Sequence, residues 1–206
     1  MDRGEASDAR GSARISIWRS LGHSLSGVRD DPSGFTLIEL MVVTSMFLIL
    51  IGIAVPQYKA LTLQLRTTSV ATQLASDINF ARIQSLRTAT THYVAVTPAT
   101  GVAYKVQRSA APPAIVPASD PAVRTVTLTN SMPGVSFSLN GATTDPYGNA
   151  VTGATPTGAL GFDARGIPLT AGTYFIASSD NANSYAVTVT GAGRVRIWSK
   201  VAGAWR

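Results

Sequence analysis

The sequence contains no cysteine, which excludes a disulfide framework, a thiolate nucleophile and a cysteine metal site. Histidine is also scarce, and the two copies are His23 and His92. Neither lies in a pattern that supplies the positioned partner a catalytic base requires. The acidic residues show no calcium or zinc spacing. We therefore expect a protein that is not an enzyme and that uses no cofactor and no metal.

Charge is missing from one long stretch of the chain. Residues 37–55 are 19 residues whose single ionisable side chain is that of Glu39. A helix of this length covers roughly the 30 Å hydrocarbon core of a bilayer. The stretch is longer than the apolar part of a cleaved signal peptide, and a polar segment, residues 1–34, precedes it. We expect one retained membrane span after a disposable leader.

A carboxylate inside a membrane span is costly and is usually functional. Here it belongs to the stretch GFTLIELMVV, residues 34–43, which closely resembles the processing and methylation site of type IV prepilins and type II secretion pseudopilins. The resemblance implies that prepilin peptidase cleaves after Gly34 and methylates the new amino terminus at Phe35. It also implies a cytoplasmic leader, a single span in the bacterial inner membrane and a periplasmic head. The alternative is an ordinary signal anchor with a chance glutamate.

Glycine and proline are both absent between Pro56 and Pro98. Apolar residues recur there at helical spacing, at Val70, Leu74, Ile78 and Ala81. The pattern predicts that the membrane helix continues to about Arg87, with a kink at Pro56, where family members often carry a helix-bending proline. Four charged residues of this segment would form a solvated face: Arg66, Asp77, Arg82 and Arg87.

After residue 88 the chain changes to short β-branched and aromatic runs separated by turn signals, which indicates antiparallel strands. We expect strands at 92–97, 102–107, 123–129, 135–139, 173–178, 185–190 and 194–200. Two stretches, RSAAPPAIVPASDPA and NGATTDPYGNAVTGATPTG, are predicted surface loops. The fold class is α+β, type IV pilin-like, with a long N-terminal helix packed on a small β-rich head. The domains are a leader (1–34), a helix (35–90) and a head (91–206).

Two blocks in the head, GFDARG (161–166) and GRVRI (193–197), resemble recurring blocks of the GspH/FimT branch, the H-type pseudopilins of type II secretion and the FimT-like minor pilins. We expect an ion pair between Asp163 and Arg165 and a turn that Gly166 permits. The stretch DPYGN (145–149) is faintly similar to major pseudopilins, although a turn explains it adequately.

The carboxyl-terminal strand is the most basic region. Strand alternation places one group of residues on a single face, Arg194, Arg196, Trp198 and Lys200. Cations on that face would lie about 6.7 Å apart, close to twice the roughly 3.4 Å rise per nucleotide of a DNA strand, and an exposed tryptophan could stack on a base. The alternative is an ordinary edge strand whose solvent face is polar.

Two functions follow from these resemblances. The first is a minor pseudopilin of a type II secretion system, a structural subunit of a periplasmic pseudopilus that acts in protein export. The second is a FimT-like minor pilin of a type IV pilus that binds DNA for natural transformation through Arg194 and Arg196. Both imply the prepilin peptidase, other pilins or pseudopilins and the inner membrane as partners, and the second adds DNA.

Overall fold

The computed structural model describes residues 34–97, 102–111, 119–155 and 159–206. Most of the expected leader, residues 1–33, and parts of the first predicted loop lie outside the described residues. The chain divides into two units, Met1–Ile51 and Gly52–Arg206.

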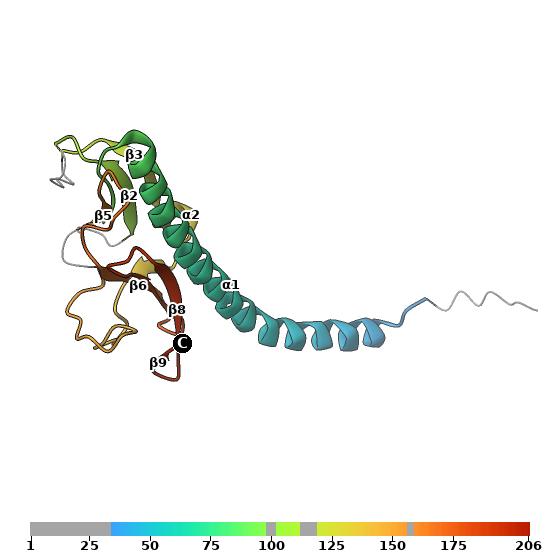
Figure 1. Cartoon of the computed structure of the whole chain (residues 1–206). Coiled ribbons are helices and arrows are strands. Elements are labelled where there is room, and N and C mark those ends of the chain that lie inside the picture. The colour runs from blue at the N-terminus through green and yellow to red at the C-terminus, as the bar shows by residue number, and fades with distance from the viewer. Residues whose placement is uncertain (1–33, 98–101, 112–118, 156–158) are drawn as a thin grey trace, which may run out of the picture. The chain divides into compact units, whose positions relative to one another are not determined.

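The N-terminal unit contains the apolar start of helix α1, which spans Leu37–Thr88 (Figure 1). Apolar side chains here are exposed on all sides, with Leu37 at 77% and Leu48 at 70% exposure. A helix that is apolar around its whole circumference matches a lipid environment. Among the described helices, α1 has the length and composition to cross a membrane, which agrees with the membrane span expected from the sequence.

The larger unit begins with the rest of α1, which continues without interruption through Pro56 and ends at Thr88. The helix predicted to run to about Arg87 is therefore confirmed, whereas the kink at Pro56 stays a prediction. The predicted apolar stripe is also confirmed, because Val70, Leu74, Ile78 and Ala81 are fully buried. Burying one such aliphatic side chain contributes about 1.5–3 kcal/mol, so this stripe holds the helix on the head.

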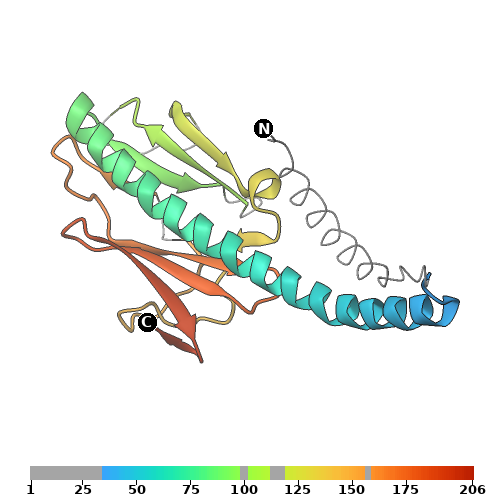
Figure 2. The same ribbon diagram turned by 90° about the vertical axis from the view of Figure 1, so that its right-hand side faces the viewer.

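The head consists of two antiparallel sheets beside α1 (Figures 1 and 2). One sheet has the order β3-β2-β1-β5 and contains β1 (His92–Val96), β2 (Ala103–Arg108), β3 (Ala122–Thr127) and β5 (Leu160–Phe162). The other has the order β4-β6-β7-β8-β9 and contains β4 (Val135–Phe137), β6 (Gly172–Ser178), β7 (Ser184–Val189), β8 (Val195–Val201) and β9 (Ala204–Trp205). A short helix, α2 (Leu128–Ser131), follows β3.

One hydrophobic core joins the helix to both sheets. It contains Leu74 and Ile78 of α1 together with Phe162 of the first sheet and Ile176 of the second. The hydroxyl of Tyr174 on β6 donates to the backbone carbonyl of Val94 on β1 at 2.7 Å and so links the two sheets directly. The α+β prediction is confirmed by this arrangement.

The strand predictions were incomplete. The segment predicted at 123–129 ends at Thr127, because Leu128 is buried at the start of α2. Two strands were missed, β5 with three residues and β9 with two. Segments this short carry too little alternation to be detected in the sequence. Both exist because a neighbouring strand supplies their hydrogen bonds, β1 for β5 and β8 for β9.

Candidate functional site

The processing motif lies at the start of α1. Gly34 and Phe35 precede the helix, and Thr36 caps it, because the Thr36 hydroxyl accepts the backbone N–H of Glu39 at 3.2 Å. A threonine followed three residues later by glutamate is the pattern of a capping box. Glu39 forms no salt bridge within the described part of the chain. Its carboxylate is therefore available to a group that another molecule supplies.

The GFDARG and DPYGN blocks form the same hydrogen-bonded turn. In each, the Oδ1 atom of the aspartate accepts backbone N–H groups two and four residues later; the donors are Tyr147 and Asn149 for Asp145, and Arg165 and Ile167 for Asp163. The glycine three residues after each aspartate has a positive φ, 86° at Gly148 and 71° at Gly166, a backbone region that favours glycine. The interpretation of both blocks as turns is confirmed.

The predicted ion pair in the first of these turns is also present. Arg165 Nε lies 3.4 Å from Asp163 Oδ2. The backbone N–H of Ile167, together with the N–H and guanidinium of Arg165, lowers the pKa of Asp163 below its usual range. The carboxylate therefore stays ionised and holds the turn together.

Arg82 of α1 joins the two head blocks to the helix. Its Nε atom donates to the carbonyl of Gly166 at 3.1 Å, and its Nη1 atom donates to the carbonyl of Gly193 at 3.2 Å. A Cβ atom added to Gly193 would lie 3.2 Å from the Arg82 guanidinium carbon. The absence of a side chain at Gly193 thus allows this close approach. The solvated-face prediction is wrong for Arg82, which is half-buried.

Asp77 is a second polar contact between helix and head. Asp77 is 1% exposed, and its carboxylate accepts hydrogen bonds from the Tyr104 hydroxyl at 2.7 Å and from Arg124 Nη1 at 2.6 Å. Burial, followed by the Asp77 carboxylate, raises the pKa of Tyr104, which keeps this hydroxyl protonated as a donor. The solvated-face prediction is wrong here too. It holds for Arg87, which is exposed, while half-buried Arg66 donates to the carbonyl of Pro133.

The basic strand β8 has the predicted alternation but a different environment. Arg196, Trp198 and Lys200 lie on the sheet face away from α1, where Trp198 joins a small cluster with Phe175 and Ala186. Arg194 comes just before the strand and is exposed, as is Arg196. The guanidinium carbon of Arg196 lies 5.7 Å from the centre of the Trp198 ring.

Trp198 is not the exposed stacking surface that the sequence suggested. It is half-buried, its ring meets that of Tyr147 edge-on at 5.7 Å, and its indole N–H donates to Thr188. Lys200 is also engaged, because its Nζ atom donates to the carbonyl of Asn140 at 3.3 Å. The loop that contains DPYGN covers this part of the face. Of the predicted stripe, the two arginines are left at the surface.

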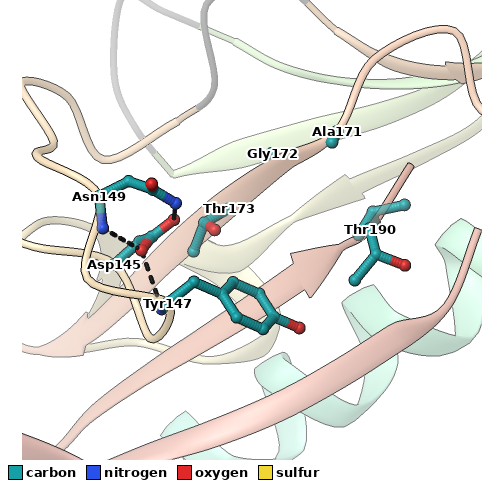
Figure 3. A pocket seen from close by; sticks show the side chains of 8 residues that line it. Asp145, Tyr147, Asn149, Ala171, Gly172, Thr173 and Thr190 are labelled. Atoms are coloured by element: carbon teal, nitrogen blue, oxygen red, sulfur yellow. Dashed lines mark hydrogen bonds between the residues drawn. The ribbon is translucent and has the colours of Figure 1, made fainter. Parts of the chain in front are cut away.

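A hollow of about 330 Å³ lies between the DPYGN turn and strands β6 and β7 (Figure 3). Its lining includes Asp145, Tyr147, Thr173 and Thr190. The carboxylate of Asp145 is occupied by the backbone and side chain of its own turn. The described side chains that line the hollow form no hydrogen bond that pairs a nucleophile with a base.

His92 begins β1, as expected, and is a structural residue. It is 2% exposed, and its Nδ1 atom lies 3.1 Å from the carbonyl of Thr90. Burial lowers the pKa of His92, and the facing Arg108 adds to that effect. Within the described ranges, no three His, Asp or Glu side chains gather where they could hold a metal ion.

Comparison with known proteins agrees with this architecture. The model of the prokaryotic N-terminal methylation motif matches residues 31–55, which include Gly34, Phe35 and Glu39. The model of the type II transport protein GspH matches residues 70–193, which run from the buried stripe of α1 through the GFDARG turn to Gly193. No curated protein and no solved structure matches the chain significantly. With an N-methylation motif and a match over more than half of its length, the chain belongs to the GspH family of pilin-like type II transport proteins, whose members are structural subunits.

Proposed function

We propose that this protein is a minor pseudopilin of a type II secretion system, a structural subunit of the periplasmic pseudopilus that acts in protein export. The observation that carries the proposal is the GspH match over residues 70–193, which covers the last part of α1 and most of the head, the two parts that Arg82 and Asp77 hold together. A subunit that is extracted from a membrane and packed into a filament needs a head that is held firmly against the helix beneath it.

The processing motif supports a defined order of events at the amino terminus. Prepilin peptidase cleaves after Gly34 and methylates Phe35, the leader (1–34) remains cytoplasmic, and the head (91–206) faces the periplasm. The new amino group at Phe35 lies four residues from Glu39. An α-amine is largely protonated at neutral pH, and methylation preserves that charge. Glu39 then pairs with the amino terminus of an adjacent subunit, since a carboxylate packed among membrane helices requires a cation.

A second candidate function is that of a FimT-like minor pilin that binds DNA. The observation in its favour is that Arg194 and Arg196 are exposed and form no salt bridge within the described residues. Against it stand the covered Trp198 and the engaged Lys200. The GspH match ends at Gly193, immediately before this basic stretch. We therefore rank DNA binding second.

Deletion of the gene in a host that both exports a type II substrate and takes up DNA tests the first proposal. We expect export to stop and transformation to survive, with export restored by the wild-type gene. Intact export in the deletion strain would refute the secretion role. Loss of transformation with intact export would favour the second candidate function, that of a DNA-binding minor pilin.

A gel-shift titration with the full mature chain in detergent tests the second candidate. Each arginine that contacts a phosphate contributes about 0.7 to 0.9 to the slope of log K against log salt. Replacing Arg194 and Arg196 by alanine should then lower the slope by roughly twice that amount. The matched control replaces two different exposed arginines, Arg87 and Arg108, and should leave the slope unchanged. Absence of any shift at low salt would eliminate this candidate.

A further inference from the structure

Strand β8 is only partly covered along its outer edge. The short strand β9 pairs with its last two residues, Lys200 with Trp205 and Val201 with Ala204 (Figure 2). Arg206 extends this pairing by exchanging two backbone hydrogen bonds with Ser199, at 2.8 and 2.9 Å. In the part of the chain that the structure describes, no strand pairs with that edge from Val195 to Trp198.

The unpaired backbone groups on this edge belong to Val195 and Ile197. Successive residues of an antiparallel strand direct their N–H and C=O groups to opposite edges. Ser199 bonds outward, to Arg206, so Ile197 and Val195, two and four residues earlier, also point outward. Neither has a backbone or side-chain hydrogen bond on that side among the described residues. Ile197 is 42% exposed, so the edge is accessible.

The side chains along this edge differ between the two faces of the sheet. On the face toward α1 stand the apolar residues Val195 and Ile197, and on the opposite face stands the exposed Arg196. Arg194, also exposed, comes just before the strand. Neither arginine has an acidic partner within the described residues. The side chains of a strand added to this edge would alternate between the two faces, so that some lie beside the apolar residues and the others beside the arginines. Complementarity therefore calls for apolar residues on one face and carboxylates on the other.

We propose that the open edge of β8 binds an extended segment of another protein chain, in which acidic and apolar side chains alternate. The segment would occupy the same position in the sheet as β9, end to end with it, and would pair with Val195 and Ile197. Edge addition of this kind uses main-chain hydrogen bonds for affinity and the alternating side chains for specificity. The inference does not depend on which filament the protein joins.

Two alternatives to peptide binding are an edge that prevents strand pairing and an edge that binds nucleic acid. Charged residues on an edge strand often serve to prevent pairing, in which case the edge binds nothing. A nucleic acid would satisfy the two arginines through its phosphates, which accept hydrogen bonds but cannot donate them. It would thus leave the carbonyls of Val195 and Ile197 unpaired. A polypeptide strand supplies both donors and acceptors, which is why we favour it.

The probe is a capped eight-residue peptide that alternates valine and glutamate, added to the full mature protein in detergent micelles. Amide hydrogen exchange is measured residue by residue. In the free protein the amides of Val195 and Ile197 should exchange fast, whereas that of Ser199 is already protected by Arg206. On addition of the peptide, we expect Val195 and Ile197 to become protected. A peptide that alternates valine and lysine should bind at least about tenfold more weakly.

Two N-methylated peptides serve as the matched controls. Opposite Val195 and Ile197, the residues that bond to β8 place their side chains toward α1, so they are the valines. Methylation of the valine amides should abolish binding, and methylation of the glutamate amides should not. Replacing Arg194 and Arg196 by glutamate should reverse the preference toward the lysine peptide.

The proposal would be supported if the valine–glutamate peptide protects the amides of Val195 and Ile197, the valine–lysine peptide does not, and methylation of the valine amides removes the protection. It would be overturned by an absence of protection at millimolar peptide, or by equal binding of both methylated peptides. A single-stranded oligonucleotide that binds at the arginines while the glutamate peptide does not would also overturn it, and would favour the nucleic acid.

Discussion

The Nη1 atom of Arg82, in the last quarter of α1, donates at 3.2 Å to the carbonyl oxygen of Gly193, which lies two residues before the start of β8. The same guanidinium donates through Nε to Gly166. One side chain therefore fixes two turns that are 27 residues apart in the sequence against the helix. Because the fork of a guanidinium has a fixed geometry, a lysine cannot reproduce both bonds.

Replacement of Arg82 by alanine should lower the free energy of unfolding by about 1.5–3 kcal/mol, the range for hydrogen bonds to charged groups. Arg82→Lys should recover only part of that loss. Chemical denaturation of the processed protein in detergent measures the effect. Arg87→Ala, at an exposed position five residues later, is the control and should change stability by less than about 0.5 kcal/mol. Equal effects at the two positions would contradict the role of Arg82.

The close approach of Gly193 to Arg82 can be tested separately from its backbone conformation. Gly193 and Gly141 have similar φ values, 76° and 69°, but a Cβ atom at Gly141 would meet nothing within 4 Å. Gly141→Ala should therefore lose only about 1 kcal/mol, the strain of a left-handed alanine. Gly193→Ala should lose about 1 kcal/mol more, because the new methyl displaces the guanidinium. In an Arg82→Ala background this excess should vanish, and its persistence would show that Arg82 is not its cause.

The buried carboxylate of Asp77 leads to a third prediction. Removing one partner of a buried ion pair lowers the free energy of unfolding by about 3–5 kcal/mol. Because the Arg124 side chain is half-exposed, we expect Arg124→Ala to fall at the lower end of this range. Asp77→Ala should be worse, because it leaves both Arg124 and the buried Tyr104 hydroxyl without an acceptor. A double-mutant cycle on Asp77 and Arg124, followed by denaturant unfolding, measures the coupling. Additive effects would contradict a direct interaction.

The sequence predicted the features that depend on local patterns. The stripe from Val70 to Ala81 and most strand positions can be read from residue spacing, and the motif that includes Gly34 and Glu39 from its resemblance to prepilin processing sites. The roles of Asp77 and Arg82 could not be predicted from the sequence, because their partners lie 27 to 111 positions away along the chain and only the fold brings them together.

The error at Trp198 has a related physical cause. Alternation correctly assigned Trp198 to the face that carries Arg196. It could not indicate that the loop with Tyr147 folds over that face. Alternation gives the direction of a side chain, whereas its exposure depends on what packs against the sheet from elsewhere in the chain.

The lowered pKa of His92 predicts how stability changes with pH. The folded state holds the imidazole neutral, because burial and the facing Arg108 disfavour its charged form. The unfolded state takes up a proton as the pH falls through the ordinary histidine range, near 6.5, so the unfolded state binds more protons than the folded one. Stability should thus fall as the pH drops from about 7 to about 5. The slope of unfolding free energy against pH should be smaller in His92→Gln; equal slopes would rule out His92 as the source.

Glu39 provides a test of assembly that is separate from insertion and processing. In the single subunit its carboxylate has no salt-bridge partner among the described residues and lies in the first turn of α1. We expect this position to lie near the end of the membrane span, where water can reach it. Glu39→Ala should therefore insert and be cleaved after Gly34 as the wild type is. In the filament the carboxylate would be buried against a neighbour's amino group, so the same variant should enter filaments at least about tenfold less well.

Mass spectrometry of the amino terminus measures cleavage and methylation, and copurification with the other pseudopilins measures assembly. Glu39→Asp keeps the charge and should assemble better than Glu39→Ala, while Thr36→Ala removes the helix cap but leaves the carboxylate and should assemble normally. Normal assembly of Glu39→Ala would refute the pairing of this carboxylate with the amino terminus of a neighbouring subunit.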